Sequence, residues 1–117
     1  MRALTVYAHP NPKSFCRAIL DRFTQGLQDA GHVSEASDRV PLLHHEKALI
    51  ISTTLFSEEN YKAEWEAPMT RIIDDWGLRY PGVKNVEHVY FYRVPVAGDG
   101  TRRGYLERAY DLGRHFA

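Results

Sequence analysis

The stretch LTVYAHPNPKSFCRAILDRF, residues 4–23, decides the fold class of this chain. It opens on a short, β-branched and largely apolar run at residues 4–8, which Pro10 and Pro12 close off. A near-continuous apolar strand at this point is typical of a buried parallel strand and not of a solvent-facing hairpin. We therefore predict a buried strand that leads, through a proline-stiffened turn, into the residues from Phe15 onward.

An amphipathic helix is expected after the turn. Apolar side chains recur at i, i+3, i+4, i+8 and i+12 from Phe15 to Leu27, and charged or amide side chains occupy the other faces. Gly31 stands where a C-terminal helix cap is expected. The pattern predicts a helix that begins near Phe15 and ends before Gly31.

Three further strands are expected along the chain. Residues 32–38 have a weak, polar strand pattern that is typical of a sheet edge. Residues 48–54, ALIISTT, are continuous and apolar, as in a central strand. Residues 88–94, HVYFYRV, are aromatic and β-branched, which also favours a strand.

Two more helices complete the pattern. After a loop at residues 55–60, a helix with Pro68 in its first turn presents one apolar stripe, which we interpret as core or as a dimer face. The stripe consists of Trp65, Met69, Ile72, Ile73 and Trp76. The last helix covers residues 101–116. This alternation predicts an α/β sheet with helices on its faces, in a single domain over residues 1–117.

Composition and charge exclude several classes of protein. The 15 Lys plus Arg and 15 Asp plus Glu of the 117 residues give a net charge of 15 − 15 = 0, without the basic excess of a nucleic-acid binder. The single cysteine, Cys16, rules out an internal disulfide, and no apolar run approaches the roughly 20 residues of a membrane helix. We expect a cytoplasmic protein, since the first ten residues lack the layout of a signal peptide.

His44 and His45, followed by Glu46, raise the question of a metal site. Adjacent side chains on a short turn project apart, and the sequence holds no second ligand pair with metal spacing. We therefore predict no metal site.

One junction does not fit a regular α/β sheet. The expected second strand ends near Val40 and the third begins near Lys47, which leaves only residues 41–46 between them. A parallel crossover needs a dozen or more residues, usually with a helix. Either these two strands pair antiparallel, or the chain lacks a strand–helix unit that the pattern requires.

The turn HPNPKSF, residues 9–15, is the first candidate site. In an open α/β sheet, ligands bind at the carboxyl ends of strands, and the next helix N-terminus offers free N–H groups to an anion. Ser14 adds a hydroxyl and Lys13 a positive charge, so the turn could hold a phosphate. It has neither the glycine fingerprint of a dinucleotide fold nor a Walker loop. Ser14 could equally be a simple helix cap, with Pro12 opening the helix.

Residues 6–23, VYAHPNPKSFCRAILDRF, resemble the opening of the NAD(P)H:quinone oxidoreductase family, flavodoxin-like flavoproteins that begin with V-x-A-H-x-x-x-x-S-F. The resemblance resumes at KALIISTT and continues through Tyr61, LRYPGVKNVEHVYFYRVPVA and TRRGYLERAYDLG. It covers nearly the whole chain except residues 35–46. It implies a flavodoxin-like three-layer sandwich with a five-stranded parallel sheet, and a homodimer with active sites at the subunit interface.

The resemblance also implies a cofactor, a reaction and site residues. Family members bind FAD or sometimes FMN; NAD(P)H gives a hydride to the flavin, and a quinone then takes two electrons. Tyr61 would be the catalytic tyrosine, which stabilises the reduced flavin by donating a hydrogen bond. The residues implied to bind the cofactor are His9, Ser14, Phe15 and Cys16 at the phosphates, Thr53 and Thr54 at the ring, and Arg102 and Leu106 near the adenosine of FAD.

The chain departs from the family pattern at several places. Leu55 and Phe56 stand where members have a Gly-Gly pair that lets the backbone approach the ring. No histidine follows Tyr61 within a few residues, and Cys16 replaces a frequent asparagine. The long family segment with the central strand, its aromatic flavin loop and the next helix is reduced to residues 40–46. The chain thus resembles a member that lacks one central strand–helix unit.

Three functions follow as alternatives. The first is a flavin-dependent NAD(P)H:quinone oxidoreductase. The second is a flavin-poor binding or regulatory module, such as the ancillary subunits of potassium-efflux systems that some family relatives form. The third is an inactive deletion product with unpaired central strands. Bound flavin would distinguish the first from the other two.

Overall fold

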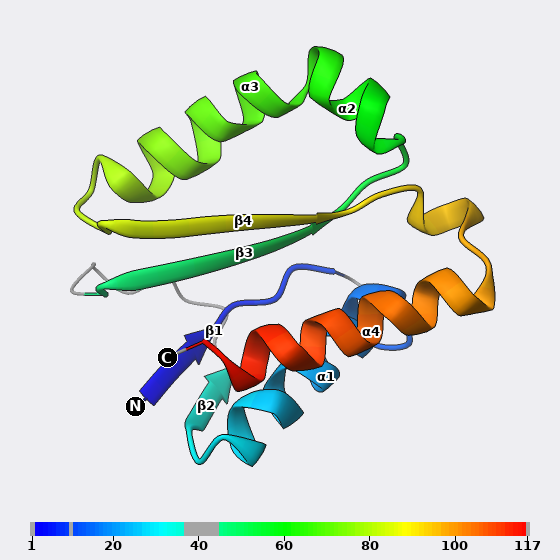
Figure 1. Cartoon of the computed structure of the whole chain (residues 1–117). Coiled ribbons are helices and arrows are strands. Elements are labelled where there is room, and N and C mark those ends of the chain that lie inside the picture. Colours follow the sequence, from blue (N-terminus) through cyan, green and yellow to red (C-terminus); the bar gives the residue numbers. More distant parts are fainter. Residues whose placement is uncertain (1, 10, 37–44, 117) are drawn as a thin grey trace. The chain divides into compact units, whose positions relative to one another are not determined.

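Two pairs of parallel strands form the framework of the structure (Figure 1). The computed structural model describes residues 2–9, 11–36 and 45–116. Two compact units make up the chain: unit 1 consists of residues 1–41 and 98–117, and unit 2 of residues 42–97. The single domain over residues 1–117 stays a prediction.

Each unit holds one strand pair. In unit 1, β1 (Arg2–Thr5) pairs with β2 (Val33–Ala36), from Arg2 opposite Val33 to Thr5 opposite Ala36. In unit 2, β3 (Lys47–Thr53) pairs with β4 (Asn85–Phe91), from Lys47 opposite Asn85 to Thr53 opposite Phe91. Both pairs are parallel, as expected of an α/β fold in which helices connect the strands.

The strand pairs settle the question posed by the short junction. Among the described strands, β2 and β3 do not pair with each other, so the antiparallel alternative is wrong. A flavodoxin-like sheet has the strand order 2-1-3-4-5. Removing its central strand leaves strands 2 and 1 as one pair and strands 4 and 5 as another. Over the described residues, the β1–β2 and β3–β4 pairs are therefore those of a flavodoxin-like sheet without its central strand.

Strand boundaries differ from the sequence prediction where pairing ends. β1 covers Arg2–Thr5 in place of residues 4–8, because only these residues have partners in β2. β4 covers Asn85–Phe91 in place of residues 88–94, because Arg93 adopts a left-handed conformation with φ of 54° and a short 3-10 helix, η2 (Val94–Val96), follows. β3 agrees with its prediction to within one residue at each end.

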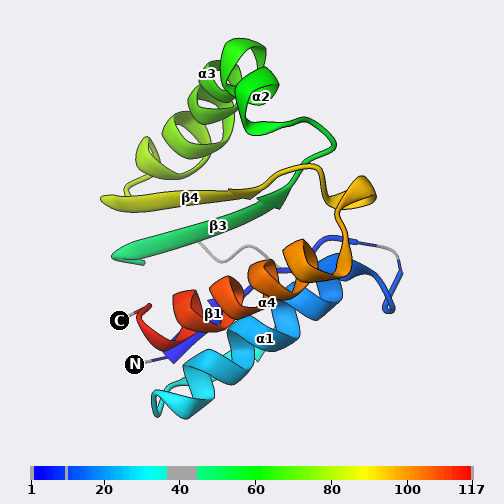
Figure 2. The ribbon, with the colours of Figure 1, turned by 45° about the vertical axis from the view of Figure 1, so that its right-hand side comes forward.

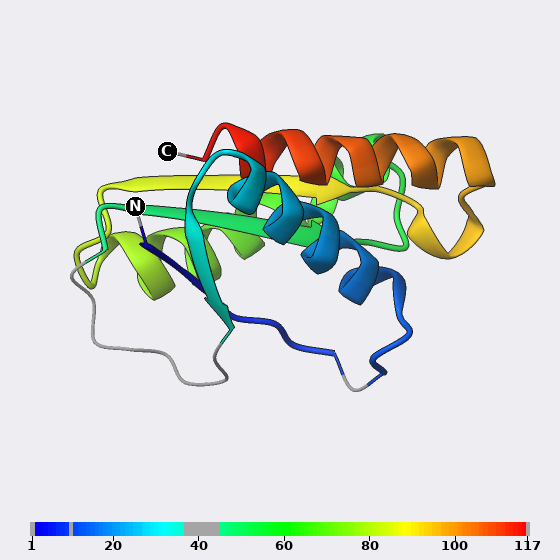
Figure 3. The same cartoon turned by 90° about the horizontal axis from the view of Figure 1, so that it is seen from below.

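Two long helices pack against each other in unit 1 (Figures 2 and 3). They are α1 (Phe15–Asp29) and α4 (Asp99–Arg114), both at nearly the predicted places. The apolar stripe of α1 is buried at Ile19 and Leu27, and α4 buries Ala109. No helix in the described part of the chain is long and apolar enough to span a bilayer.

Two glycines let α1 and α4 approach closely. A Cβ atom on Gly26 would lie 2.1 Å from the Tyr110 carbonyl oxygen, and one on Gly113 would lie 2.1 Å from the Phe23 carbonyl oxygen. Real Cβ atoms cannot occupy such positions, so each glycine meets the backbone of the facing helix directly. Glycine at both positions is thus required by the packing.

A helical segment connects β3 to β4 in unit 2 and covers one face of this pair (Figure 1). It consists of α2 (Glu58–Glu64), α3 (Glu66–Met69) and a π-helix, η1 (Thr70–Arg79). The wider winding of η1 is seen at its end, where the Tyr80 N–H donates to the Asp75 carbonyl oxygen, five residues earlier, at 2.7 Å.

The predicted loop at residues 55–60 is confirmed for residues 55–57 and wrong for residues 58–60, which belong to α2. Ser57 caps α2 by accepting the Asn60 N–H on its Oγ at 3.3 Å, so the segment is helical from Glu58. Pro68 lies in the first turn of α3, as predicted, and explains why the helix breaks at Trp65. Pro68 has no N–H to donate to the carbonyl oxygen of Glu64, four residues earlier, and the proline ring would clash with that carbonyl group in a regular helix.

The apolar stripe of this segment does not form core. Trp65, Ile72 and Trp76 are exposed and Met69 and Ile73 are only half-buried, whereas the neighbouring Asp74 is buried. Its interpretation as core is therefore wrong, because the face of η1 turned to the sheet is the one that carries Asp74.

We expect Gly113→Ala to destabilise the protein by about 1–3 kcal/mol, because the added methyl group must push α1 away from α4. Gly104→Ala, on the same helix, is the matched control: its Cβ would meet no atom within 4 Å. That substitution should be neutral or stabilise by up to about 1 kcal/mol, since alanine favours helix more than glycine does. Urea unfolding followed by circular dichroism measures both. Equal effects of the two substitutions would contradict the close helix crossing.

Candidate functional site

The turn before α1 is held by its own side chains. Ser14 Oγ lies 2.9 Å from the Tyr7 hydroxyl and accepts the Arg17 N–H at 3.1 Å. Asn11 Oδ1 accepts the Lys13 N–H at 2.9 Å, and His9 Nδ1 accepts the Asn11 N–H at 3.1 Å. These contacts fix the loop so that the N-terminus of α1 follows it directly, with its positive dipole end at the turn.

Arg102 of α4 lies at the same end of α1. Its guanidinium carbon is 5.4 Å from the centroid of the Phe15 ring, a cation–π distance. The structure thus brings together two residues that the resemblance implies at the cofactor, although 87 positions separate them (102 − 15 = 87). Cys16 of α1 and Leu106 of α4 are half-buried in the same unit. This end of unit 1 therefore combines a helix N-terminus, hydroxyl and imidazole side chains, and the charges of Lys13 and Arg102.

The carboxyl end of β3 carries the threonines implied at the flavin ring. Thr53 ends β3 opposite Phe91. The Thr54 N–H donates to the Phe91 carbonyl oxygen at 3.0 Å, and its carbonyl accepts the Val94 N–H at 3.1 Å. The Thr54 Oγ1 accepts the Phe56 N–H at 3.0 Å. The Thr54 side chain thus shapes the turn that replaces the family's Gly-Gly pair.

Tyr61, the tyrosine implied to act on the flavin, lies inside unit 2. Its side chain belongs to α2, the residue is 6% exposed, and its ring packs on Tyr90 with centroids 4.6 Å apart. Burial raises the pKa of Tyr90, and a hydrogen bond with Tyr61 raises it further. Burial also raises the pKa of Tyr92, next to Tyr61. The two phenols therefore stay protonated at neutral pH.

The residues implied at the cofactor fall in both units. His9, Ser14, Phe15, Cys16, Arg102 and Leu106 belong to unit 1, and Thr53, Thr54 and Tyr61 belong to unit 2. The phosphate and adenosine residues are thus in one unit and the ring residues in the other.

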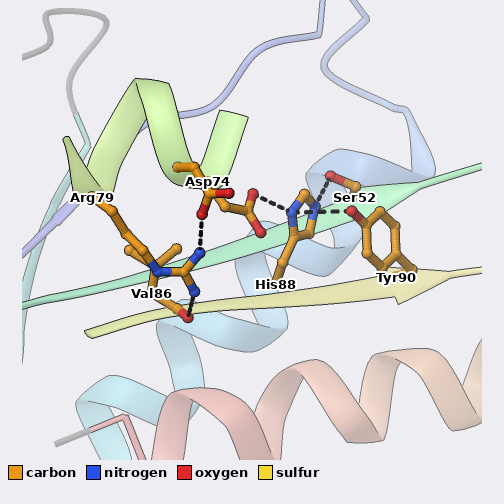
Figure 4. Close-up of polar contacts among 7 residues, drawn as sticks. Ser52, Asp74, Arg79, Val86, His88 and Tyr90 are labelled. Carbon is orange, nitrogen blue, oxygen red and sulfur yellow. Dashed lines mark hydrogen bonds and ion pairs between the residues drawn. The ribbon is translucent and has the colours of Figure 1, made fainter. Parts of the chain in front are cut away.

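A buried polar cluster in unit 2 was not predicted (Figure 4). His88 of β4 lies at its centre: Nδ1 is 2.8 Å from Asp74 Oδ1 and 3.2 Å from the Tyr90 hydroxyl, and Nε2 is 2.7 Å from Ser52 Oγ. The side chains of His88 and Asp74 are 5% and 6% exposed. His88 thus has a carboxylate on one side of its ring and a hydroxyl on the other, so both ring nitrogens have hydrogen-bond partners.

The position and burial of this cluster indicate that it stabilises the fold and does not catalyse a reaction. Carboxylate, imidazole and hydroxyl follow one another as in a nucleophile-activating triad. Ser52, however, lies within β3 and not on an exposed turn, and the other two side chains are almost fully buried. The cluster joins η1 to both strands, which requires every member to keep its partner. No local pattern could have revealed it, since Ser52 and His88 are 36 residues apart.

At the other end of η1, Arg79 fixes the segment from the surface (Figure 4). Its Nη2 donates to the Val86 carbonyl oxygen of β4 at 3.1 Å, and its Nη1 pairs with Asp75 at 2.6 Å. Unlike the Asp74–His88 pair, this ion pair is about half exposed.

No metal cluster is found among residues 2–9, 11–36 and 45–116, where no three His, Cys, Asp or Glu side chains gather. His44, part of the His-His-Glu run, lies outside the described residues.

A solved structure has the same fold as this chain. It is the NAD(P)H:quinone oxidoreductase from Methanothermobacter marburgensis, with a TM-score of 0.87 and 21% sequence identity. The match covers 99% of this chain and 96% of that chain. The flavodoxin-like α/β class predicted from the sequence is thereby confirmed. No protein-family model and no curated protein matches this sequence.

The extent of this match bears on the missing central segment. Because nearly all of both chains is aligned, the solved chain has about the same length and no room for a long central insertion. The short junction is therefore shared by two proteins that differ at most positions. The short junction is thus not peculiar to this chain.

We expect Asp74→Ala to lower the free energy of unfolding by about 1–3 kcal/mol, because the buried His88 N–H loses its acceptor. Asp75→Ala is the control. It removes the neighbouring carboxylate, whose ion pair with Arg79 lies on the surface, and should cost less than about 0.5 kcal/mol. Thermal and urea unfolding of the two variants provide the comparison. A loss at Asp75 as large as that at Asp74 would show that the buried cluster does not hold unit 2 together.

Proposed function

We propose that this chain is a flavin-dependent NAD(P)H:quinone oxidoreductase whose cofactor is anchored at the N-terminus of α1. The observation that carries the proposal is the placement of Arg102 over Phe15 at the end of a capped helix, 5.4 Å from the ring centroid. The name and fold of the Methanothermobacter marburgensis protein support it. So does the opening sequence, which resembles that of the same family.

The donors in unit 1 suit the phosphates of a dinucleotide. Helix N–H groups favour an anion, and the Ser14 hydroxyl, the His9 imidazole and the Lys13 ammonium are all close in sequence to them. Phe15 and Cys16 would present their backbone N–H groups to the phosphates. Arg102 and Leu106 belong to the same unit, which favours FAD over FMN, because only FAD has an adenosine to contact them.

The residues of unit 2 would meet the flavin ring. Thr53 and Thr54 lie at the carboxyl end of β3, where ligands of α/β folds bind. Tyr61 would donate its hydrogen bond as negative charge develops on the reduced ring. When bound, the flavin supplies the two-electron chemistry, accepting a hydride from NAD(P)H and passing both electrons to a quinone. A homodimer and a cytoplasmic location are parts of the same proposal.

A flavin-poor binding module is the second candidate. Two observations favour it: Tyr61 is only 6% exposed, and the Thr54 hydroxyl is engaged by the Phe56 N–H. Both residues would have to move, or a second protomer complete the site, before they could contact a ring. An inactive deletion product is disfavoured, since the short junction recurs in a protein named as an oxidoreductase.

The visible spectrum of the purified protein, before and after addition of FAD and desalting, tests the first function directly. We expect a retained flavin band, followed by quinone reduction with NADH or NADPH. A colourless protein that still unfolds cooperatively would contradict this function and favour the binding module.

We expect Arg102→Gln to weaken FAD binding at least about tenfold, because a charge-assisted contact contributes about 1.5–3 kcal/mol. FMN, which lacks the adenosine, should be affected less. Arg103→Gln, an exposed neighbour on the same helix, is the matched control and should leave both affinities unchanged. Quenching of flavin fluorescence measures the affinities of the unaltered chain and of both variants for FAD and for FMN. Equal losses for Arg102→Gln and Arg103→Gln would mean that only net charge matters.

A further inference from the structure

The backbone of Arg93 adopts a conformation that arginine rarely takes. Its φ and ψ angles are 54° and 34°, in the left-handed region, where the β-carbon of any residue other than glycine is crowded by the backbone. Among the described residues, no other non-glycine residue has a positive φ. Strained residues of this kind gather at active sites and in ligand-binding segments. The strain therefore points to a function for this arginine.

Hydrogen bonds hold Arg93 beside the turn that follows β3. The Arg93 N–H donates to the Phe56 carbonyl oxygen at 3.1 Å, and the Val94 N–H donates to the Thr54 carbonyl oxygen at 3.1 Å. The turns at the carboxyl ends of β3 and β4 are thus joined, with Thr54 in the first and Arg93 in the second. Ligands of α/β folds bind at this edge of the strands.

The Arg93 side chain is available to a ligand. The residue is exposed, and none of the ion pairs among the described residues includes it. It is also the only lysine or arginine in residues 54–57 and 92–98, which follow β3 and β4. A guanidinium presents its N–H donors in a rigid plane that matches two oxygens of a phosphate. The carboxyl edge of the β3–β4 pair therefore carries a cation suited to a phosphate group.

We propose that Arg93 binds a phosphate group of the hydride donor, NADH or NADPH, and is a specificity-determining residue for that substrate. The inference rests on the proposed function, in which the flavin ring lies at Thr53 and Thr54 and the flavin phosphates lie in unit 1. The donor dinucleotide brings phosphates of its own to the ring, and Arg93 supplies their cation in unit 2. A quinone carries no phosphate, so this contact distinguishes the hydride donor from the acceptor.

Isothermal titration calorimetry with NADP⁺ tests this assignment. NADP⁺ carries the phosphates of NADPH but cannot donate a hydride, so binding is measured without turnover. We expect Arg93→Gln to weaken NADP⁺ binding at least about tenfold and to leave FAD binding unchanged. Lys84→Gln is the matched control, because Lys84 is exposed in the same unit but precedes the opposite end of β4. It should bind NADP⁺ like the unaltered chain.

A titration with NAD⁺ identifies the phosphate that Arg93 contacts. A loss for NADP⁺ alone assigns the contact to the 2′-phosphate, which NAD⁺ lacks. An equal loss for both dinucleotides assigns it to the pyrophosphate. Either result agrees with the proposal.

Arg93→Gly separates the role of the side chain from that of the turn. Glycine adopts the left-handed conformation without crowding, so this variant should melt at a temperature no lower than that of the unaltered chain. It should nevertheless bind NADP⁺ as weakly as Arg93→Gln does. A lower melting temperature with unchanged NADP⁺ binding would mean that Arg93 serves the fold and not a ligand.

Three further outcomes would overturn the proposal: no NADP⁺ binding by the unaltered chain, equal binding by the unaltered chain and Arg93→Gln, or an equal loss in Lys84→Gln. Flavin retention is measured separately, from the visible spectrum. A colourless chain contradicts the proposed function, whereas an NADP⁺ affinity that only the Arg93 variants lose supports the role of Arg93 with or without flavin.

Discussion

Two parallel strands can pair only if the chain between them is long enough to return to the same end of the sheet. The connection from β1 to β2 contains α1, and the connection from β3 to β4 contains α2, α3 and η1. Between β2 and β3 there are only residues 37–46. Ten residues cannot make such a crossover, so the strands divide into two pairs. The helices that each pair carries, and the residues it can gather into a site, follow from this division.

A two-stranded sheet offers little apolar surface, so each unit depends on a few specific contacts. In unit 1 these are the approaches of Gly26 and Gly113 to the facing helix backbones. In unit 2 the buried Asp74–His88 pair joins η1 to the strands. The first requires the absence of side chains and the second a complete set of hydrogen bonds. Both kinds of contact are therefore intolerant of substitution.

Patterns that repeat along the chain predicted the elements, and contacts between distant residues escaped prediction. The stripe from Phe15 to Leu27 was enough to place α1, and the run ALIISTT was enough to place β3. The start of α2 was missed although Ser57 followed by two glutamates is a recognisable cap. The π-helical winding of η1 and the His88 cluster could not be predicted from the sequence, because an apolar stripe does not reveal which residues face the sheet. A polar residue, Asp74, marks the buried face here.

The two halves of the proposed cofactor site depend on the missing strand to different degrees. The turn before α1 is fixed by contacts among residues 7–17, so it can form whatever lies beside β1. The ring residues are positioned by the β3–β4 pair and its turn, and in the family the central strand adjoins them. Without that strand, Thr54 holds the Phe56 N–H and Tyr61 packs on Tyr90. The phosphate half of the proposed site therefore keeps the pattern that the sequence resembles, and the proposal requires the ring half to hold a flavin through contacts that differ from those of the family.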